Sequence, residues 1–307
     1  MPHAALPYHP RRRFALALMV AFLIGTAVLV LAPARVPAQS PVQTKESIDW
    51  LRFDYPPMYI VAGPHAGQGY MDKILELLIA KMPAYDHQVR VANLSRIMSE
   101  LEQGNNVCIA SLFVNEERQR LGHVSRGKTT LLPPVQLVFR AEDGERFTAF
   151  GNPASLDSIL ADESLMLGVS DRMSYGIEID QTVAAHQHQP NVFLRNGSDV
   201  GLGLHEMLMK GRIDYTINYS WAANFTAGPE QAGLLDFLPF IEAGPYPSHH
   251  VICTKNPWGK RVLETVDALL ADDDLTRQRK EFIEAWLPES ERPAFRETFD
   301  RRFGLGR

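Results

Sequence analysis

Short apolar runs typical of strands alternate with amphipathic segments typical of helices along the first half of the chain. Between Tyr70 and Met82 the apolar residues recur at helical spacing, and Pro83 stops the run. The predicted elements are strands at residues 48–53, 89–92 and 107–110, a long strand at 131–140, and helices at 70–82 and 96–103. This alternation predicts an α/β fold in which a mostly parallel sheet is flanked by helices.

A second series of the same kind follows a charged, turn-like stretch at residues 141–146. Its predicted elements are helices at 156–160, 175–185 and 200–209 and strands at 165–169, 192–194 and 215–218. Prolines and glycine at residues 244–247 break the chain again, before a strand at 250–254 and two helices within 262–286. We therefore expect two lobes joined by a double crossover: 39–141 as the first part of lobe 1, 142–243 as lobe 2, and 244–307 returning to lobe 1 with C-terminal helices. A ligand cleft between the lobes follows, since pockets favour such interfaces.

The first 38 residues have the pattern of an export segment. Arg11, Arg12 and Arg13 precede an uncharged apolar run at residues 14–32, and Val36-Pro37-Ala38 offers small residues suited to cleavage. The run is longer than the ~7–15 apolar residues of a usual signal peptide and reaches the ~17–25 of a membrane span. Residues 1–38 are therefore predicted to be a signal peptide or an uncleaved N-terminal anchor, and the rest to be periplasmic or extracytoplasmic.

Composition narrows the choice of partners. Residues 1–38 hold four arginines and no acid, so the remainder carries 27 basic and 36 acidic residues and a net charge of −9. Nucleic acids and anionic membranes both favour a basic face, which argues against either as the main partner.

The chain has two cysteines, Cys108 and Cys253. We expect two buried unpaired thiols, with a disulfide as the alternative, because nothing in the sequence sets their separation.

The clearest candidate for chemistry lies between Asn106 and Ser125. A buried strand ends near Ser111, Asn115 is a good N-cap, and the helix that follows carries Arg118. A strand end beside a helix N-terminus and an arginine can hold a carboxylate or phosphate. His186 and His188 could form a metal pair, but no acid or cysteine lies near them in the sequence, so neither a metal nor a cofactor is expected.

Several short blocks, in this order and spacing, resemble the family 3 bacterial extracellular solute-binding proteins, the periplasmic components of polar amino acid importers. They are Tyr55-Pro56-Pro57, the stretch from Ser111 to Gln119, Gly168-Val169 followed by Ser174, Gly211-Arg212-Ile213-Asp214, and Trp286. The resemblance implies the type II periplasmic-binding fold. It also implies that Ser111 and Arg118 grip a ligand carboxylate, that Tyr55 flanks the ligand, and that Ser174 serves at the second lobe.

Two positions depart from that family. The acid that pairs the ligand's ammonium in amino acid binders aligns with Tyr219, and a second hydroxyl position aligns with Phe113. Burying an unpaired ammonium is costly, so an ordinary amino acid is not the expected ligand. An aromatic or ring-shaped acid would suit the aromatic residues that could line the cleft, namely Tyr55, Tyr59, Tyr175, Tyr219, Trp221 and Tyr246.

The leading functional hypothesis is a monomeric solute-binding protein. It would capture a small anionic or carboxylate-bearing solute between two lobes, through Tyr55, Ser111, Arg118, Ser174 and Tyr219, and deliver it to the permease of an ABC-type importer. Closure on the ligand would follow the hinge mechanism for which periplasmic binding proteins are the standard example. Two alternatives stay open: a membrane-anchored sensor or partner-binding module of the same fold, and an enzyme, for which no acid–base pair stands out in the sequence.

Overall fold

The computed structural model describes residues 45–197 and 199–305. Thr44–Arg307 forms one compact unit. The predicted signal peptide or anchor at residues 1–38 lies outside the described residues and stays a prediction. Across the described ranges, no helix combines the length and apolar character needed to cross a bilayer.

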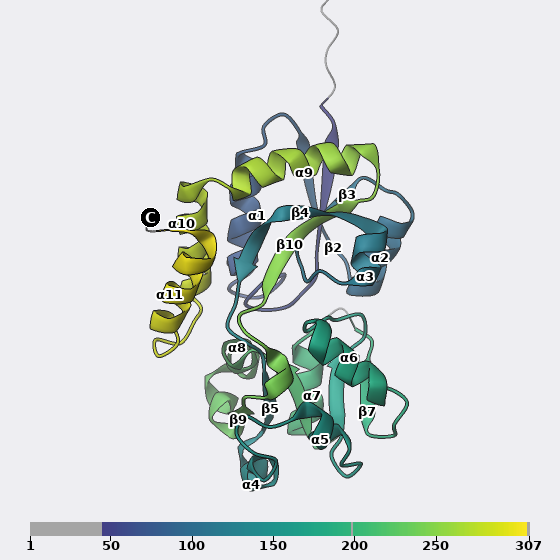
Figure 1. The fold of residues 1–307 in the computed structure, drawn as a ribbon, viewed down its shortest axis with the longest axis vertical. Coiled ribbons are helices and arrows are strands. Elements are labelled where there is room, and N and C mark those ends of the chain that lie inside the picture. Colours follow the sequence, from purple (N-terminus) through teal and green to yellow (C-terminus); the bar gives the residue numbers. More distant parts are fainter. Residues whose placement is uncertain (1–44, 198, 306–307) are drawn as a thin grey trace, which may run out of the picture. The chain divides into compact units, whose positions relative to one another are not determined.

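Two five-stranded sheets organise this unit (Figure 1). The first sheet has the order β2 (Asp86–Val91), β1 (Ser47–Arg52), β3 (Val107–Leu112), β10 (Ser248–Thr254) and β4 (Gly122–Leu131). The second has the order β7 (Val192–Arg195), β6 (Leu167–Ser170), β8 (Tyr215–Asn218), β5 (Gln136–Arg140) and β9 (Leu235–Leu238).

The two sheets share one plan. In each, three neighbouring strands are parallel, the fourth is antiparallel to its neighbours, and the fifth runs with the first three. The antiparallel strand, β10 or β5, is the first strand after the chain has crossed from the other sheet. The expected fold class, two lobes with mostly parallel sheets and a double crossover, is confirmed.

Helices flank both sheets. Those between strands of the first sheet are α1 (Tyr70–Ala80), α2 (Leu94–Glu102) and α3 (Glu116–Leu121). Those that belong with the second are α4 (Gly144–Thr148), α5 (Leu156–Leu160), α6 (Ile177–His186), α7 (Leu202–Met209) and α8 (Ser220–Gln231). The C-terminal part adds α9 (Pro257–Leu270), α10 (Asp273–Glu284) and α11 (Arg292–Phe303). Short 3-10 turns lie at Ala141–Asp143, Ala232–Leu234 and Ile241–Ala243.

Local sequence explains where several of these helices begin. Helices α2, α3, α5, α9 and α10 each follow an Asn, Ser or Asp whose side chain accepts a hydrogen bond from the backbone N–H three residues later. Such N-caps satisfy one of the free donors at a helix start. At α3, Asn115 Oδ1 accepts from the N–H of Arg118 at 2.9 Å, which fixes the position of the arginine that the sequence singled out.

The long strand predicted at residues 131–140 is wrong. Pro133 and Pro134 have no backbone N–H for a sheet ladder, so β4 ends at Leu131 and β5 starts at Gln136 in the other sheet. The first crossing is therefore at residues 132–135 and not at 141–146. The second crossing lies between β9 and β10, at residues 239–247, and Figure 1 shows both connections running between the two sheets.

The expectation of two unpaired thiols is also wrong, because Cys108 and Cys253 form a disulfide. Strand β10 pairs antiparallel with β3 in a register that sets Cys253 opposite Cys108, with their Cα atoms 4.1 Å apart. The two cysteines are 145 residues apart in the sequence. The bond therefore closes a loop that contains the whole second sheet, and it holds the returning strand β10 beside β3 in the interior of the first sheet.

Reduction of this disulfide should destabilise the protein. Loss of a native disulfide typically costs about 2–5 kcal/mol, and the effect grows with the length of the closed loop. In urea titrations of the wild type, we expect a phosphine reductant to lower the free energy of unfolding by that amount. The unfolding midpoint should therefore move to a lower urea concentration. A Cys108→Ala/Cys253→Ala variant should not respond to the reductant, and equal midpoints for oxidised and reduced wild type would contradict the expectation.

Candidate functional site

One cavity is lined by residues from both sheets, and we call it the Arg118 cavity. The first sheet and its loops contribute Phe53, Tyr55, Met58, Ser111, Leu112, Phe113, Arg118 and His249. The second contributes Met173, Ser174, Tyr175 and Tyr219, and Val135 comes from the first crossing. Most of these residues follow the carboxyl ends of β1, β3, β6 and β8, which is where ligands bind in α/β sheets.

All five residues predicted from the sequence to bind ligand line this one cavity: Tyr55, Ser111, Arg118, Ser174 and Tyr219. They come from segments as far apart as β1 and β8. Their shared location is a finding of the structure, whereas their role in ligand binding stays a prediction.

Arg118 is the charged centre of the cavity and is only 2% exposed. Its Nη1 donates to the carbonyl oxygen of Phe113 at 2.9 Å, and its Nη2 donates across to the carbonyl oxygen of Arg172 in the second lobe at 3.3 Å. Burial lowers the pKa of Arg118 to about 10, an effect that Asp180 and Glu117 oppose. The guanidinium is thus charged, buried and bonded to neutral carbonyls.

The two nearest acids are engaged with other groups. Glu117 forms an ion pair with Arg172 at 2.8 Å. Asp180 accepts from the N–H of Tyr175 at 2.8 Å and from the hydroxyl of Ser174. Burial raises the pKa of Asp180, an effect that its hydrogen bonds from Ser174 and Tyr175 and the charge of Arg118 oppose. Within the described part of the chain, no carboxylate forms an ion pair with Arg118 itself.

The two predicted serines have different surroundings. Ser111 is buried near the end of β3, and its hydroxyl points to the sulfur of Met58 at 3.2 Å, which is a weak acceptor. Its proton can therefore turn to a better acceptor at little cost. Ser174 precedes α6 and gives its proton to Asp180, so it can offer a ligand only its lone pairs in this arrangement.

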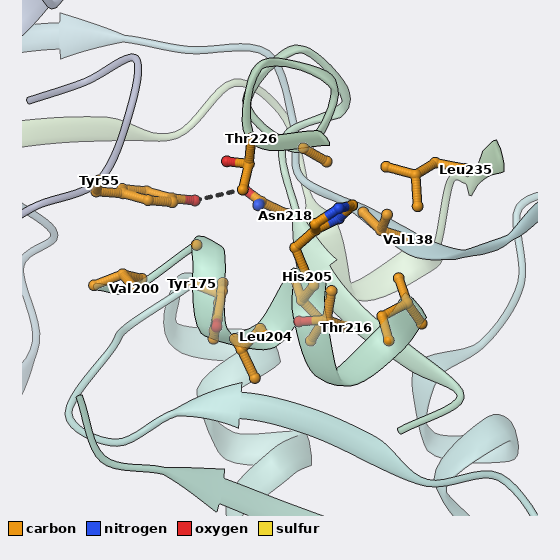
Figure 2. Close-up of a pocket in the computed structure, with 14 residues that line it drawn as sticks. Tyr55, Val138, Tyr175, Val200, Leu204, His205, Thr216, Asn218, Thr226 and Leu235 are labelled. Atoms are coloured by element: carbon orange, nitrogen blue, oxygen red, sulfur yellow. Dashed lines mark hydrogen bonds between the residues drawn. The ribbon is translucent and has the colours of Figure 1, made fainter. Parts of the chain in front are cut away.

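Tyr55 joins the two lobes directly. Its hydroxyl donates to Asn218 Oδ1 at 2.6 Å, and the same oxygen accepts from the N–H of Tyr219 at 2.8 Å. Figure 2 shows this bond at the edge of a second, mostly apolar cavity, which we call the Thr216 cavity and which is lined largely by β8, α7 and α8. Tyr55 and Tyr175 line both cavities and so form a shared wall.

Tyr219 is the N-cap residue of α8, and its ring stacks on Trp221 with centroids 5.2 Å apart. Tyr219 is 2% exposed, and its hydroxyl has no hydrogen-bond partner. Burial raises the pKa of Tyr219, so the hydroxyl keeps its proton and remains a buried donor without a partner. Of the other aromatic residues named in the sequence, Tyr55 and Tyr175 also line the Arg118 cavity, while Tyr59, Trp221 and Tyr246 do not.

His249 is a lining residue that the sequence did not identify. Its Nδ1 lies 2.9 Å from Thr130 Oγ1, and its ring contacts that of Phe113 with centroids 4.3 Å apart. Burial, with the charge of Arg118, lowers the pKa of His249 to about 3, so the imidazole is neutral. The sequence indicates that His249 and His250, as neighbours in a strand, point to opposite faces of the sheet. It does not indicate which of the two faces the Arg118 cavity.

The described residues contain no group of three or more His, Cys, Asp or Glu arranged to hold a metal ion. His186, one of the pair considered from the sequence, forms a hydrogen bond with Asp157 Oδ1 at 2.8 Å.

The Arg118 cavity has a volume of about 20 Å³, close to the space of one water molecule. A larger ligand therefore requires the residues that line the cavity to move.

Sequence comparison finds no matching family model and no matching curated protein. Solved structures are similar in fold. A putative L-cystine ABC transporter from Listeria monocytogenes has a TM-score of 0.57 and 13% identity, over 78% of this chain and 95% of that one. An ancestral arginine-binding protein bound to arginine has a TM-score of 0.60 and 12% identity, over 80% and 99% of the two chains. A histidine kinase sensor domain with similarity to periplasmic binding proteins has a TM-score of 0.60 and 15% identity, over 79% of this chain and 96% of that one.

These similarities define a structural class. The chain has the two-lobed, type II periplasmic-binding-protein fold, with two mixed sheets flanked by helices and linked by two crossings. The family suspected from the short sequence blocks has this same fold, so the resemblance holds at that level. The identities of 12–15% show the fold alone.

The neutral, buried His249 predicts a specific pH dependence. Its pKa is about 3 in the folded protein against 6.5 for an unperturbed histidine, so the unfolded chain binds the extra proton between those values. Stability should therefore fall as the pH drops from 6.5 towards 3, by on the order of 1 kcal/mol per pH unit from this residue.

Urea unfolding of the wild type and of His249→Gln between pH 7 and pH 5 checks this. The variant should lose less stability than the wild type over that range, whereas His188→Gln, at an exposed site, should follow the wild type. Parallel pH curves for wild type and His249→Gln would rule the effect out.

Proposed function

We propose that the protein is an extracytoplasmic solute-binding protein that holds a small carboxylate-bearing solute at Arg118. The supporting observation is the state of that guanidinium: it is 2% exposed, it bonds to two neutral carbonyl oxygens, and no carboxylate pairs with it among the described residues. A buried charge without an ion-pair partner is costly, and an anion that reaches it recovers much of that cost. A carboxylate matches the guanidinium fork with two parallel hydrogen bonds.

The neighbouring groups suit the same ligand. The Ser111 hydroxyl and the unpartnered Tyr219 hydroxyl are donors that can turn to a ligand oxygen. Tyr55 and Tyr175 supply ring faces from the two lobes. We assign ligand binding to Tyr55, Ser111, Arg118, Ser174 and Tyr219, as expected from the sequence.

Closure of the lobes is the proposed working motion. Contacts already cross between the lobes: Tyr55 with Asn218, Arg118 with the Arg172 carbonyl, and the N–H of Val200 with the Asp54 carbonyl at 3.2 Å. A ligand that touches both sides adds to these contacts only when the lobes are closed, so it shifts the population towards the closed form. A permease or another membrane partner would recognise that form.

The fold neighbours support this role without deciding the partner. Several are substrate-binding components of amino acid or cystine importers, which favours delivery to an ABC-type permease. The likeness to a histidine kinase sensor domain favours the second candidate, a sensor that reports the same closure. We favour binding over catalysis, because the lining of the Arg118 cavity has no carboxylate and its one histidine is neutral and bonded to Thr130.

A thermal-shift screen of small carboxylates, amines and neutral sugars tests the ligand class. A ligand at 100 times its dissociation constant stabilises the folded protein by about 2.7 kcal/mol, which should raise the melting temperature by roughly 5–10 °C. The stabilising compounds should be carboxylates. A screen in which only amines or neutral compounds stabilise the protein would overturn the proposal.

Arg118→Ala should weaken binding of the best carboxylate by at least 10-fold, about 1.4 kcal/mol, in titration calorimetry. Arg118→Lys should have an intermediate effect, because it keeps the charge and loses the fork. Arg120→Ala is the matched control, since Arg120 lies exposed on the same helix. Unchanged affinity in a folded Arg118→Ala variant would remove Arg118 from the site.

A further inference from the structure

The side chains that line the Arg118 cavity carry a positive charge and no negative charge. Arg118 is the single charged side chain, because His249 is neutral and neither Asp nor Glu lines the cavity. The nearest carboxylate of the second lobe, Asp180, belongs to an adjoining pocket that shares Met173 and Tyr175 with this cavity, and it already accepts from Ser174 and Tyr175. An ammonium group brought into the Arg118 cavity would meet one cation and no carboxylate in the lining itself, which makes its burial costly.

The rest of the wall is apolar and partly aromatic. Phe53, Tyr55 and Tyr175 present rings, and Met58 and Met173 present flexible thioethers from opposite lobes. Aromatic side chains favour other rings in stacked or edge contacts, and methionines adapt to irregular apolar shapes. This wall matches a ligand body that is hydrophobic and flat.

One polar group of the wall is unused. The hydroxyl of Tyr219 is buried without a partner, and it is the only such side-chain atom among the residues that line the cavity in the described part of the chain. The Tyr55 hydroxyl, by contrast, is committed to Asn218. An unpaired buried donor costs free energy until an acceptor reaches it, so a ligand oxygen at Tyr219 would be favoured.

We infer that the ligand of the Arg118 cavity is an aromatic monocarboxylate without a free ammonium group, held at its acid end by Arg118 and along its ring by Tyr55 and Tyr175. This inference rests on the proposed function and narrows its ligand class. The same cavity would exclude zwitterionic amino acids, since their carboxylate would be paired and their ammonium would not.

Matched pairs of compounds test the inference on the wild-type protein. 3-Phenylpropionate and L-phenylalanine differ only in the α-ammonium, as do 3-(4-hydroxyphenyl)propionate and L-tyrosine. In titration calorimetry we expect each deaminated acid to bind at least 10-fold more tightly than its amino acid. Hexanoate, which has the acid end and no ring, should bind more weakly than 3-phenylpropionate.

Substitutions at Tyr219 test the charge argument directly. Tyr219→Asp places an anion in the wall, so it should shift the ratio of affinities by at least 10-fold towards the amino acid. Tyr219→Asn is the matched control, because it has nearly the same shape as the aspartate without the charge and should leave the ratio close to that of wild type. If the aspartate variant does not fold, the wild-type pairs still decide the matter.

The outcomes separate the two levels of the account. Amino acids that bind wild type as tightly as the deaminated acids, with affinity lost in Arg118→Ala, would overturn the inference and leave the proposed function standing. Hexanoate binding as tightly as 3-phenylpropionate would overturn the aromatic part. Failure of every carboxylate to bind would overturn both.

Discussion

A buried guanidinium without a carboxylate partner is the constraint on which the site depends. Arg118 is held by the N-cap of α3 at one end and by carbonyl oxygens from both lobes at the other. Its charge lies in an apolar wall that offers no anion. A protein interior tolerates such a charge when hydrogen bonds satisfy it, but the arrangement leaves it ready for a stronger acceptor.

The two crossings and the disulfide determine how the lobes are connected around Arg118. The antiparallel strand of each sheet, β5 or β10, directly follows a crossing from the other sheet, so two crossings connect the lobes. Residues that follow strand ends of both sheets line the Arg118 cavity. The disulfide between Cys108 and Cys253 secures the returning strand in the first sheet, next to the strand that leads to Ser111. The contacts across to the second lobe are hydrogen bonds, the ion pair of Glu117 with Arg172 and aromatic contacts such as that of Tyr70 with Trp221, and a hinge motion has to exchange them.

Much of this could be predicted from the sequence, because it depends on local signals. Helical spacing, the Asn115 cap and the order of strands and helices indicated the α/β lobes, and the short blocks around Ser111 and Ser174 indicated residues that do line one cavity. The misplaced first crossing came from a local signal that was overlooked, because Pro133 and Pro134 break the apolar run between β4 and β5. The disulfide and the side to which His249 turns depend instead on how β10 pairs with its distant neighbours. Register and sheet membership are set by tertiary packing, which no local pattern records.

The central claim is that Arg118 is the anion receptor between the lobes. A crystal structure grown with the tightest-binding carboxylate tests it most directly. The account predicts both carboxylate oxygens within hydrogen-bond distance of the Arg118 guanidinium, with Tyr55 and Tyr175 against the body of the ligand. A bound carboxylate that lies elsewhere, while Arg118 still bonds to the carbonyls of Phe113 and Arg172, would contradict it.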